Sequence, residues 1–305
     1  MTASAAATPA ERAPDRLALG AFAAAVVIGG SNFVAVRFSN RELDPLWGAA
    51  LRFALAAAVF GILVAALRLP LPRGRVLSLM ALYGLLGFAV TYGCLYWALQ
   101  DVPAGIGAVV MAMGPLLVLL LAVAHGMERF SRRALAGALV ALVGSVVIFF
   151  QPSEIAFGWH SLLLLAIGSL AASEAVVVSK GIGRQHPVTM NFVAMSAGAA
   201  ALLVAAAVAG ERFALPSEGE TQLALAYLVF ATVALFLCVL VVVQRWTASS
   251  TAYVFVLMPI VAVVLGSLIA DEPITLTTVL GGAIVGAGVY VGALAGRASR
   301  ARRPR

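Results

Sequence analysis

Charged residues and cysteines are scarce in this chain of 305 residues. Asp, Glu, Lys and Arg make up 11% of it, against about 25% in a soluble domain, and 63% of its residues are hydrophobic. Most of the surface must therefore face lipid rather than water. The two cysteines, Cys94 and Cys238, lie inside apolar stretches, which excludes a disulfide framework and favours two buried thiols.

Motifs of the common enzyme and metal sites are also lacking. No HExxH, GxSxG or Walker A pattern occurs, and His125, His160 and His186 lie far apart, near the ends of different apolar segments. Metal chemistry needs clustered ligands, so we expect no metal, no cofactor and no enzyme. The basic C-terminal tail has no interleaved aromatic residues, so we expect contact with anionic lipid and no nucleic-acid partner.

Long apolar stretches recur at the length needed to cross a bilayer. A helix needs about 20 apolar residues to span a hydrocarbon core of about 30 Å, whereas barrel strands would alternate apolar and polar residues. These stretches are continuously apolar, so we predict an all-α polytopic membrane protein with ten transmembrane helices. The predicted helices cover residues 17–38, 46–68, 76–98, 104–125, 132–150, 158–180, 188–209, 221–243, 248–270 and 275–296.

The two halves of the chain resemble each other. A shift of 144 residues aligns Pro115 with Pro259, and a shift of 142 aligns Ser31 with Ser173. Each half holds five predicted helices, an odd number, so the halves must be inverted repeats, which are typical of secondary transporters and occur in some channels. The predicted parts are an N-terminal segment 1–16, a first repeat 17–150, a second repeat 158–296 and a basic tail 297–305.

Basic residues indicate the orientation of the chain. With both ends in the cytoplasm, sixteen of the 20 Lys and Arg residues fall in cytoplasmic segments, three fall outside, and Arg52 lies within a helix. Cytoplasmic segments of membrane proteins carry such an excess of positive charge. We therefore expect both ends of the chain to lie in the cytoplasm.

Several stretches resemble the EamA-type drug/metabolite transporter superfamily. They are SNFVAVRF, PLWGAALRFALAA, YWALQDVPAGIGAVVMAMGPLLVLLLA and GALVALVG in the first half, and VFVLMPIVAVVLGSLIADEPIT and GGAIVGAG in the second. The resemblance covers nearly the whole chain. It implies a multi-pass carrier of the bacterial inner membrane that exports small metabolites by alternating access.

Within this family we favour the aromatic amino-acid exporter branch (YddG-like), so neutral or aromatic amino acids are the expected substrates. The alternatives are another metabolite or drug efflux carrier, a passive facilitator, a channel and, least favoured, an intramembrane enzyme. By the same resemblance, Arg52 matches the arginine of the family's second helix, and Glu128 and Glu272 match its helix-ending glutamates. We expect these glutamates to fix the turn into the next helix.

Two prolines lie near the middle of predicted helices. Pro115 and Pro259 each lie 11 residues into a helix, about 16 Å deep at 1.5 Å per residue. A proline frees the carbonyl four residues before it, which is that of Met111 or Phe255. Both prolines are either tolerated kinks or hinges whose freed carbonyls bind a substrate ammonium group.

Three polar side chains interrupt the apolar helices: Asn32, Arg52 and Glu174. Polar groups at this depth usually face a cavity or a partner. Asn32 and Glu174 correspond in the two halves and are candidates for an outer and an inner gate. Glu174 is either a proton-titrating coupling site or a hydrogen-bonding partner of a nearby serine. Arg52 is either a structural residue whose long stem reaches the outer face or a contact for a substrate carboxylate.

Aromatic and small residues complete the candidate features. Phe88, Tyr92 and Tyr96 form one stripe of a helix, and Phe236 corresponds to Tyr92 in the second half, so we expect them to line a substrate cavity. The GxxxG pair Gly282 and Gly286 predicts close helix packing, within a monomer or a weak dimer.

Overall fold

The computed structural model describes residues 16–39, 41–98, 104–149, 158–270 and 276–294. All regular elements in these ranges are helices. They are α1 (Arg16–Ser39), α2 (Pro45–Ala66), α3 (Arg75–Gly84), the π-helix η2 (Leu85–Val90), α4 (Thr91–Ala98), α5 (Ala104–Met111), α6 (Gly114–Ala124), α7 (Arg132–Phe149), α8 (Trp159–Gly181), α9 (Pro187–Ala209), α10 (Gly219–Arg245), α11 (Ala248–Thr251), α12 (Tyr253–Ala270), α13 (Leu276–Val289) and the π-helix η4 (Tyr290–Leu294).

Within the described residues, seven helical segments are long and apolar enough to cross a membrane, and shorter apolar helices cover Arg16–Asn32 and Val109–Ala124. The chain is therefore an all-helical polytopic membrane protein. Local sequence sets several boundaries: α2 and α9 begin at prolines, which fit the first turn of a helix because they lack an N–H. Gly210 ends α9 with a φ of 72°, a conformation that glycine adopts without strain.

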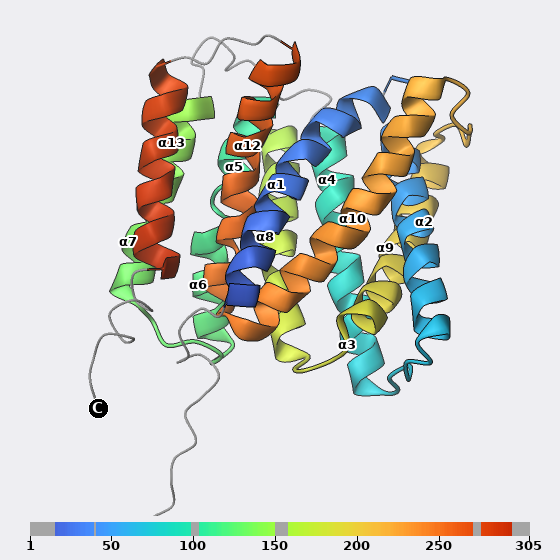
Figure 1. The fold of residues 1–305 in the computed structure, drawn as a ribbon, viewed down its shortest axis with the longest axis horizontal. Helices are drawn as coiled ribbons and strands as arrows, with labels where there is room; N and C mark the ends of the chain where they lie inside the picture. The colour runs from blue at the N-terminus through green and yellow to red at the C-terminus, as the bar shows by residue number, and fades with distance from the viewer. Residues whose placement is uncertain (1–15, 40, 99–103, 150–157, 271–275, 295–305) are drawn as a thin grey trace, which may run out of the picture.

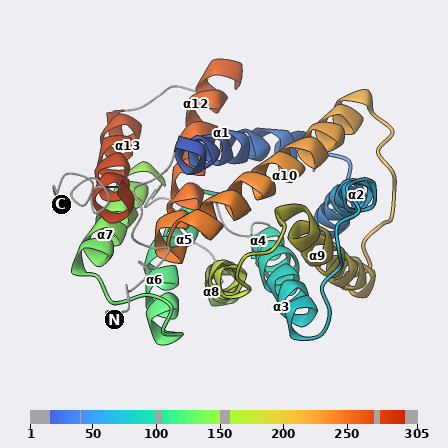
Figure 2. The same cartoon turned by 60° about the horizontal axis from the view of Figure 1, so that its bottom comes forward.

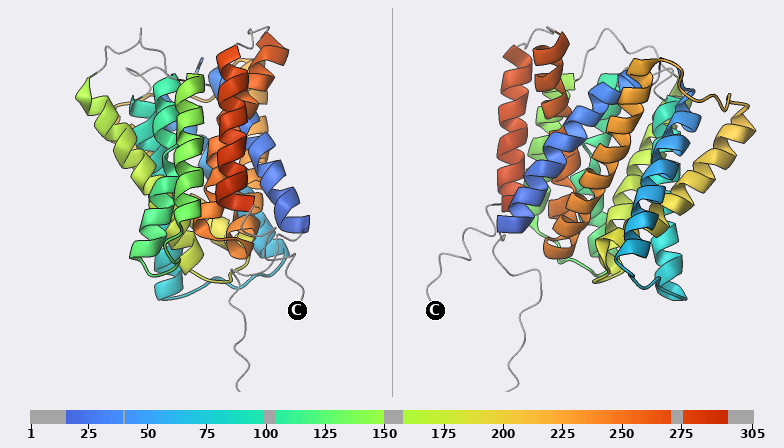
Figure 3. Two further views of the ribbon diagram at one scale, coloured as in Figure 1. Left: turned by 90° about the vertical axis from the view of Figure 1, so that its left-hand side faces the viewer. Right: turned by 45° about the vertical axis from the view of Figure 1, so that its right-hand side comes forward.

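The helices form one bundle in which the two halves of the chain are interleaved. The most extensive contacts join α2 with α9, α7 with α13, and α1 with both α10 and α12. Figure 1 shows α7 and α13 at one side of the bundle and α2 and α9 at the other, with α1 and α8 between them. The same order appears when the bundle is turned (Figure 2), and most helices run along one common direction (Figure 3).

Glycines bring α7 and α13 into close contact. A Cβ added at Gly144 would lie 2.6 Å from the backbone nitrogen of Val285, and one added at Gly288 would lie 2.5 Å from that of Ala141. Our prediction for Gly282 and Gly286 is wrong for packing within the monomer, because a Cβ at either position would meet nothing within 4 Å in the described structure. The alternative of a dimer face stays a prediction. The packed glycines lie on a different face of the helix.

Replacing Gly144 with leucine should destabilise the fold, because the new side chain would overlap the backbone of α13. Overpacking of this kind costs about 1–3 kcal/mol. Gly286→Leu is the matched control, since its side chain would enter open space. Thermal unfolding in detergent should show a lower midpoint for the first variant alone. Equal midpoints for both variants would contradict the tight α7–α13 contact.

Candidate functional site

Arg52 is a buried cation within the bundle. It lies on α2 with 4% of its surface exposed, and its Nε donates a hydrogen bond of 2.6 Å to Oγ1 of Thr232 on α10. The interpretation that its stem reaches the outer face is therefore wrong: Thr232 holds the guanidinium inside the bundle. Its Cζ lies 5.4 Å from the centre of the Phe53 ring, and it also interacts with the Tyr96 hydroxyl.

Within the described residues, no carboxylate lies within ion-pairing distance of Arg52. The ion pairs there join Arg41 to Glu220, Arg212 to Asp44, and His125 to Glu174. A buried charge is costly unless it is paired. The guanidinium is therefore suited to bind an anionic group that comes from outside the protein.

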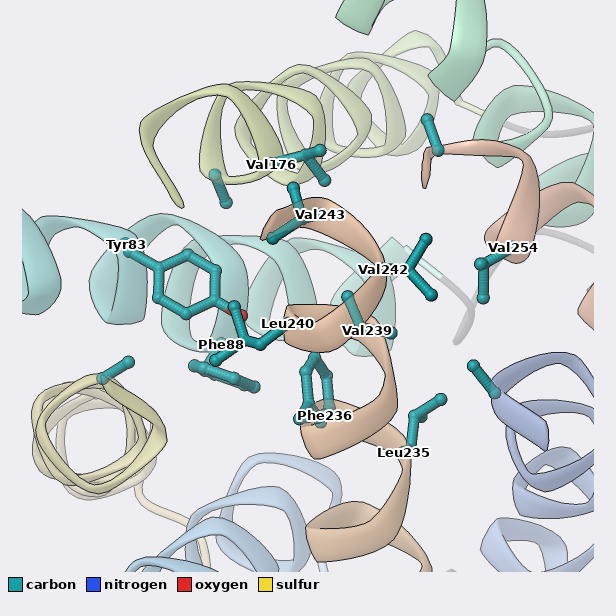
Figure 4. Close-up of a cluster of buried hydrophobic side chains, with 14 of the residues drawn as sticks. Tyr83, Phe88, Val176, Leu235, Phe236, Val239, Leu240, Val242, Val243 and Val254 are labelled. Atoms are coloured by element: carbon teal, nitrogen blue, oxygen red, sulfur yellow. The ribbon is translucent and has the colours of Figure 1, made fainter. Parts of the chain in front are cut away.

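Aromatic rings form a continuous cluster beside this cation. Ring centroids are separated by 5.0 Å between Phe53 and Phe88, 4.9 Å between Phe53 and Tyr92, 4.8 Å between Phe88 and Phe236, and 6.1 Å between Tyr92 and Tyr96. In Figure 4, Phe88 and Phe236 extend toward each other from η2 and α10. The structure thus brings together the four aromatic residues that the sequence suggested, and adds Phe53.

A π-helix widens the backbone where the cluster begins. The Thr91 hydroxyl donates a hydrogen bond of 2.7 Å to the carbonyl of Leu86, five residues earlier, at the end of η2. Its wider turn brings Tyr83 to 5.7 Å from Phe88, although five residues separate them. The α-helical spacing used for the sequence could not reveal Tyr83. Such π turns often occur at functional sites.

The two prolines are not equivalent. Pro115 lies in the first turn of α6, just after a break between Met111 and Gly114, whereas Pro259 lies inside the continuous helix α12. In the second half the break falls at Ala252, seven residues before the proline. The expectation of symmetric breaks is therefore wrong. A proline fits the first turn of a helix without strain but produces a kink in its interior.

Glu174 is paired with a histidine. Its Oε1 lies 3.2 Å from Nε2 of His125, the residue that ends α6, and its Oε2 is buried with no partner in the described residues. The expected bond to a serine is not formed, because Ser169 and Ser173 donate to backbone carbonyls instead. Sequence analysis treated His125 as a scattered residue, since nothing in its spacing indicates a partner 49 positions away.

Asn32, Met111 and Phe255 belong to α1, α5 and α12, and none of the rings of the aromatic cluster comes from these helices. Asn32 is 6% exposed on α1, and its Oδ1 has no partner in the described part of the chain. Met111 ends α5 and Phe255 belongs to α12, and both helices lie on the α7 side of the bundle (Figure 1). In the described residues, no ring contact joins Phe255 to the cluster.

Carboxylates connect the two halves at both ends of the bundle. Glu128 accepts hydrogen bonds from the hydroxyl and the backbone N–H of Ser249, at the start of α11. It therefore joins the second half, whereas we expected it to fix its own turn. At the opposite end, Glu211 accepts from the backbone N–H groups of Leu46 and Trp47, at the start of α2. Glu272 lies outside the described residues.

Asp44 and Glu42 strengthen the connection at that second end. Asp44 accepts from the N–H of Arg212, and Glu42 accepts from the hydroxyl and the N–H of Ser217. These bonds lower the pKa of Glu42. Hydrogen bonds thus connect the two halves at each end of the bundle, and in each case a carboxylate accepts them from N–H or O–H donors.

No cluster of three metal-ligating side chains occurs within the described ranges. The features that remain are one buried cation, one aromatic cluster and one His–Glu pair inside a membrane bundle. Together they suit the binding of a small molecule that carries a negative group and an apolar body.

Comparison with known proteins gives a consistent picture. Residues 16–150 and 158–293 match the EamA-like transporter family. The chain is 32% identical over 263 residues to the uncharacterized inner membrane transporter YedA of Escherichia coli K12, and this alignment covers 84% of each chain. It is 27% identical over 293 residues to a probable amino-acid metabolite efflux pump of Salmonella typhimurium, which covers 91% of this chain and 95% of that protein. A crystal structure with 19% sequence identity superposes with a TM-score of 0.77, covering 92% of this chain and 98% of that chain.

Proposed function

This chain belongs to the EamA-like transporter family, and from that premise we propose that it exports amino acids or closely related metabolites. It is a multi-pass protein of the inner membrane and transports small molecules. The similarity to a probable amino-acid metabolite efflux pump supports the amino-acid substrate. The observation that carries the proposal is the buried guanidinium of Arg52, which has no carboxylate partner within the described residues and lies beside an aromatic cluster.

In this proposal the chain crosses the membrane ten times. α3, η2 and α4 form one crossing, as do α5 with α6, α11 with α12, and α13 with η4. Each remaining long helix forms a crossing of its own. Five crossings in each half make the halves inverted repeats, with both chain ends in the cytoplasm. The extensive contacts between helices of different halves support this arrangement, because a site shared by two repeats needs such an interface.

The substrate binds between α2, α4 and α10. Its carboxylate pairs with the guanidinium of Arg52, which Thr232 holds in place through Nε. Arginine suits this role because its two terminal nitrogens can bind both oxygens of a carboxylate. Phe53, Phe88 and Phe236 receive the side chain of the substrate, which favours apolar and aromatic amino acids.

Transport proceeds by alternating access. The break before Pro115 and the kink at Pro259 act as hinges, and the carbonyls of Met111 and Phe255 face the substrate ammonium group as the pathway opens. Asn32 and Glu174 serve as outer and inner gates. Both have a buried oxygen without a partner in the described chain, which supports contact with a passing ligand.

Uptake into proteoliposomes tests this function directly. A panel of amino acids should reveal saturable flux that is accelerated by substrate on the opposite side, because a carrier must return its site to the first side. Apolar and aromatic amino acids should compete best. Conductance that does not saturate would indicate a pore instead, and the absence of amino-acid flux would refute the proposed substrate.

Replacing Arg52 with glutamine should remove the carboxylate contact selectively. We expect the apparent affinity for phenylalanine to fall about 10-fold to 100-fold, which corresponds to the loss of a hydrogen bond between charged groups. Transport of phenethylamine, which lacks the carboxylate, should be unaffected. Arg52→Lys keeps the charge and should retain part of the preference for phenylalanine over phenethylamine. The carboxylate role is wrong if Arg52→Gln lowers transport of the acid and the amine equally.

The hinges can be tested by replacing Pro115 and Pro259 with alanine, singly and together. Alanine at 115 allows α5 and α6 to join, and alanine at 259 straightens α12, so the double variant should exchange substrate several times more slowly. Pro115 is buried, so alanine there removes packed ring atoms, and exchange should be measured well below the thermal midpoint of each variant. Full exchange rates in the double variant would refute the hinge role.

A further inference from the structure

His125 and Glu174 connect two helices of different halves. His125 ends α6, and its Nε2 lies 3.2 Å from Oε1 of Glu174, which lies seven residues before the end of α8. In the proposed topology this is the cytoplasmic end of the bundle. The pair is therefore placed to hold α6 and α8 together where the pathway opens to the cytoplasm.

The hydrogen bonds of the ring fix the number of protons in this contact. Nδ1 of His125 lies 2.9 Å from the carbonyl oxygen of Leu121. A carbonyl oxygen only accepts hydrogen bonds, so Nδ1 must carry a hydrogen. A neutral ring then has a lone pair at Nε2, and a carboxylate has only lone pairs. The contact between Nε2 and Oε1 consequently requires one additional proton.

That proton can lie at either of two atoms. It lies on Nε2 in an imidazolium–carboxylate pair, or on Oε1 in an imidazole–carboxylic acid pair. When it leaves, two lone pairs face each other across 3.2 Å and the contact becomes repulsive. The His125 and Glu174 side chains are 48% and 24% exposed, so the proton can exchange with solvent at this end.

Two charged residues next to the pair in the chain, Glu128 and Lys180, have partners of their own. Glu128 accepts from Ser249, and Lys180 donates to the carbonyls of Val243 and Trp246. The titratable and charged groups on α8, on the elements that pack against α6 and α8, or next to these helices in the chain are Arg75, Tyr83, Tyr92, Cys94, Tyr96, Glu128, Arg129, Arg132, Arg133, His160, Lys180, Arg184, Glu220, Tyr227, Cys238, Arg245 and Tyr253.

We infer that His125 and Glu174 form a proton-binding site that closes the inner end of the pathway when it is occupied. This inference rests on the proposed export function and assigns a regulation to its inner gate. One proton taken up by the pair joins α6 to α8, and release of that proton to the cytoplasm separates them. Only an O–H or N–H bond forms or breaks in this step. Export therefore slows as cytoplasmic pH falls, by at most about tenfold per pH unit for a single proton.

Protonation of the His125–Glu174 pair can be observed without a transport assay, by NMR of the protein labelled with ¹⁵N-histidine in detergent. The chain has three histidines, so His160→Gln and His186→Gln assign the His125 signals by elimination. We expect the Nε2 signal of His125 to report a shared proton, and its titration midpoint to shift in Glu174→Gln. An identical titration in both proteins would overturn the inference.

Variants that keep the link and variants that lose it should change the rate of export in opposite directions. A glutamine at 174 donates its amide hydrogen to Nε2, so it should mimic the protonated pair and give slow export that does not depend on pH. Glu174→Ala and His125→Ala lose the link, and both should give export that is faster at low pH than in the unmodified protein. His160→Gln is the control, because His160 stacks on Trp159 at the other end of α8 and should leave the pH profile unchanged.

The two proposals fail in different ways. If the unmodified protein transports no amino acid, the proposed function fails, while the NMR titration still decides whether the pair binds a proton. If amino-acid flux is present and its pH profile is the same in all variants, the regulation is overturned and the export function stands.

Discussion

The one buried cation among the described residues, Arg52, places the strongest constraint on this structure. Arg52 lies 4% exposed inside the bundle, and Thr232 from the other half of the chain binds its Nε at 2.6 Å. A charge at this depth is tolerated only where neighbouring groups or a ligand compensate it. The positions of α2 and α10 relative to each other are therefore fixed by this hydrogen bond. The aromatic rings beside the guanidinium pack at the same interface.

The ends of the bundle differ from its centre in how they are held. At the centre, helices meet through apolar side chains and glycines, and these contacts are independent of pH and of salt. At the ends, carboxylates such as Glu128 and Glu211 bind the first N–H groups of helices in the opposite half. Bonds of this kind can be exchanged for water at little cost because they lie near the surface. A bundle built in this way can open at either end while its centre stays packed.

Hydropathy alone located most helices to within a few residues. The segment predicted at 188–209 is α9, Pro187–Ala209, because lipid requires a continuous apolar helix and proline and glycine mark its ends. The helix predicted at 104–125 is divided into α5 and α6, since the proline alone did not reveal where the chain would break. Phe53, Tyr83 and His125 were missed as members of the site. Their roles depend on a π turn or on pairing between distant helices, and neither leaves a periodic signal in the sequence.

The central proposal is that the site beside Arg52 opens to each side of the membrane in turn. Its most direct test is the accessibility of a cysteine at position 92, in a protein whose Cys94 and Cys238 are replaced with alanine. A membrane-impermeant thiol reagent should label this cysteine from either side, and a carboxylate-bearing substrate should protect it from both. Labelling from one side alone, or from neither, would contradict alternating access to this site.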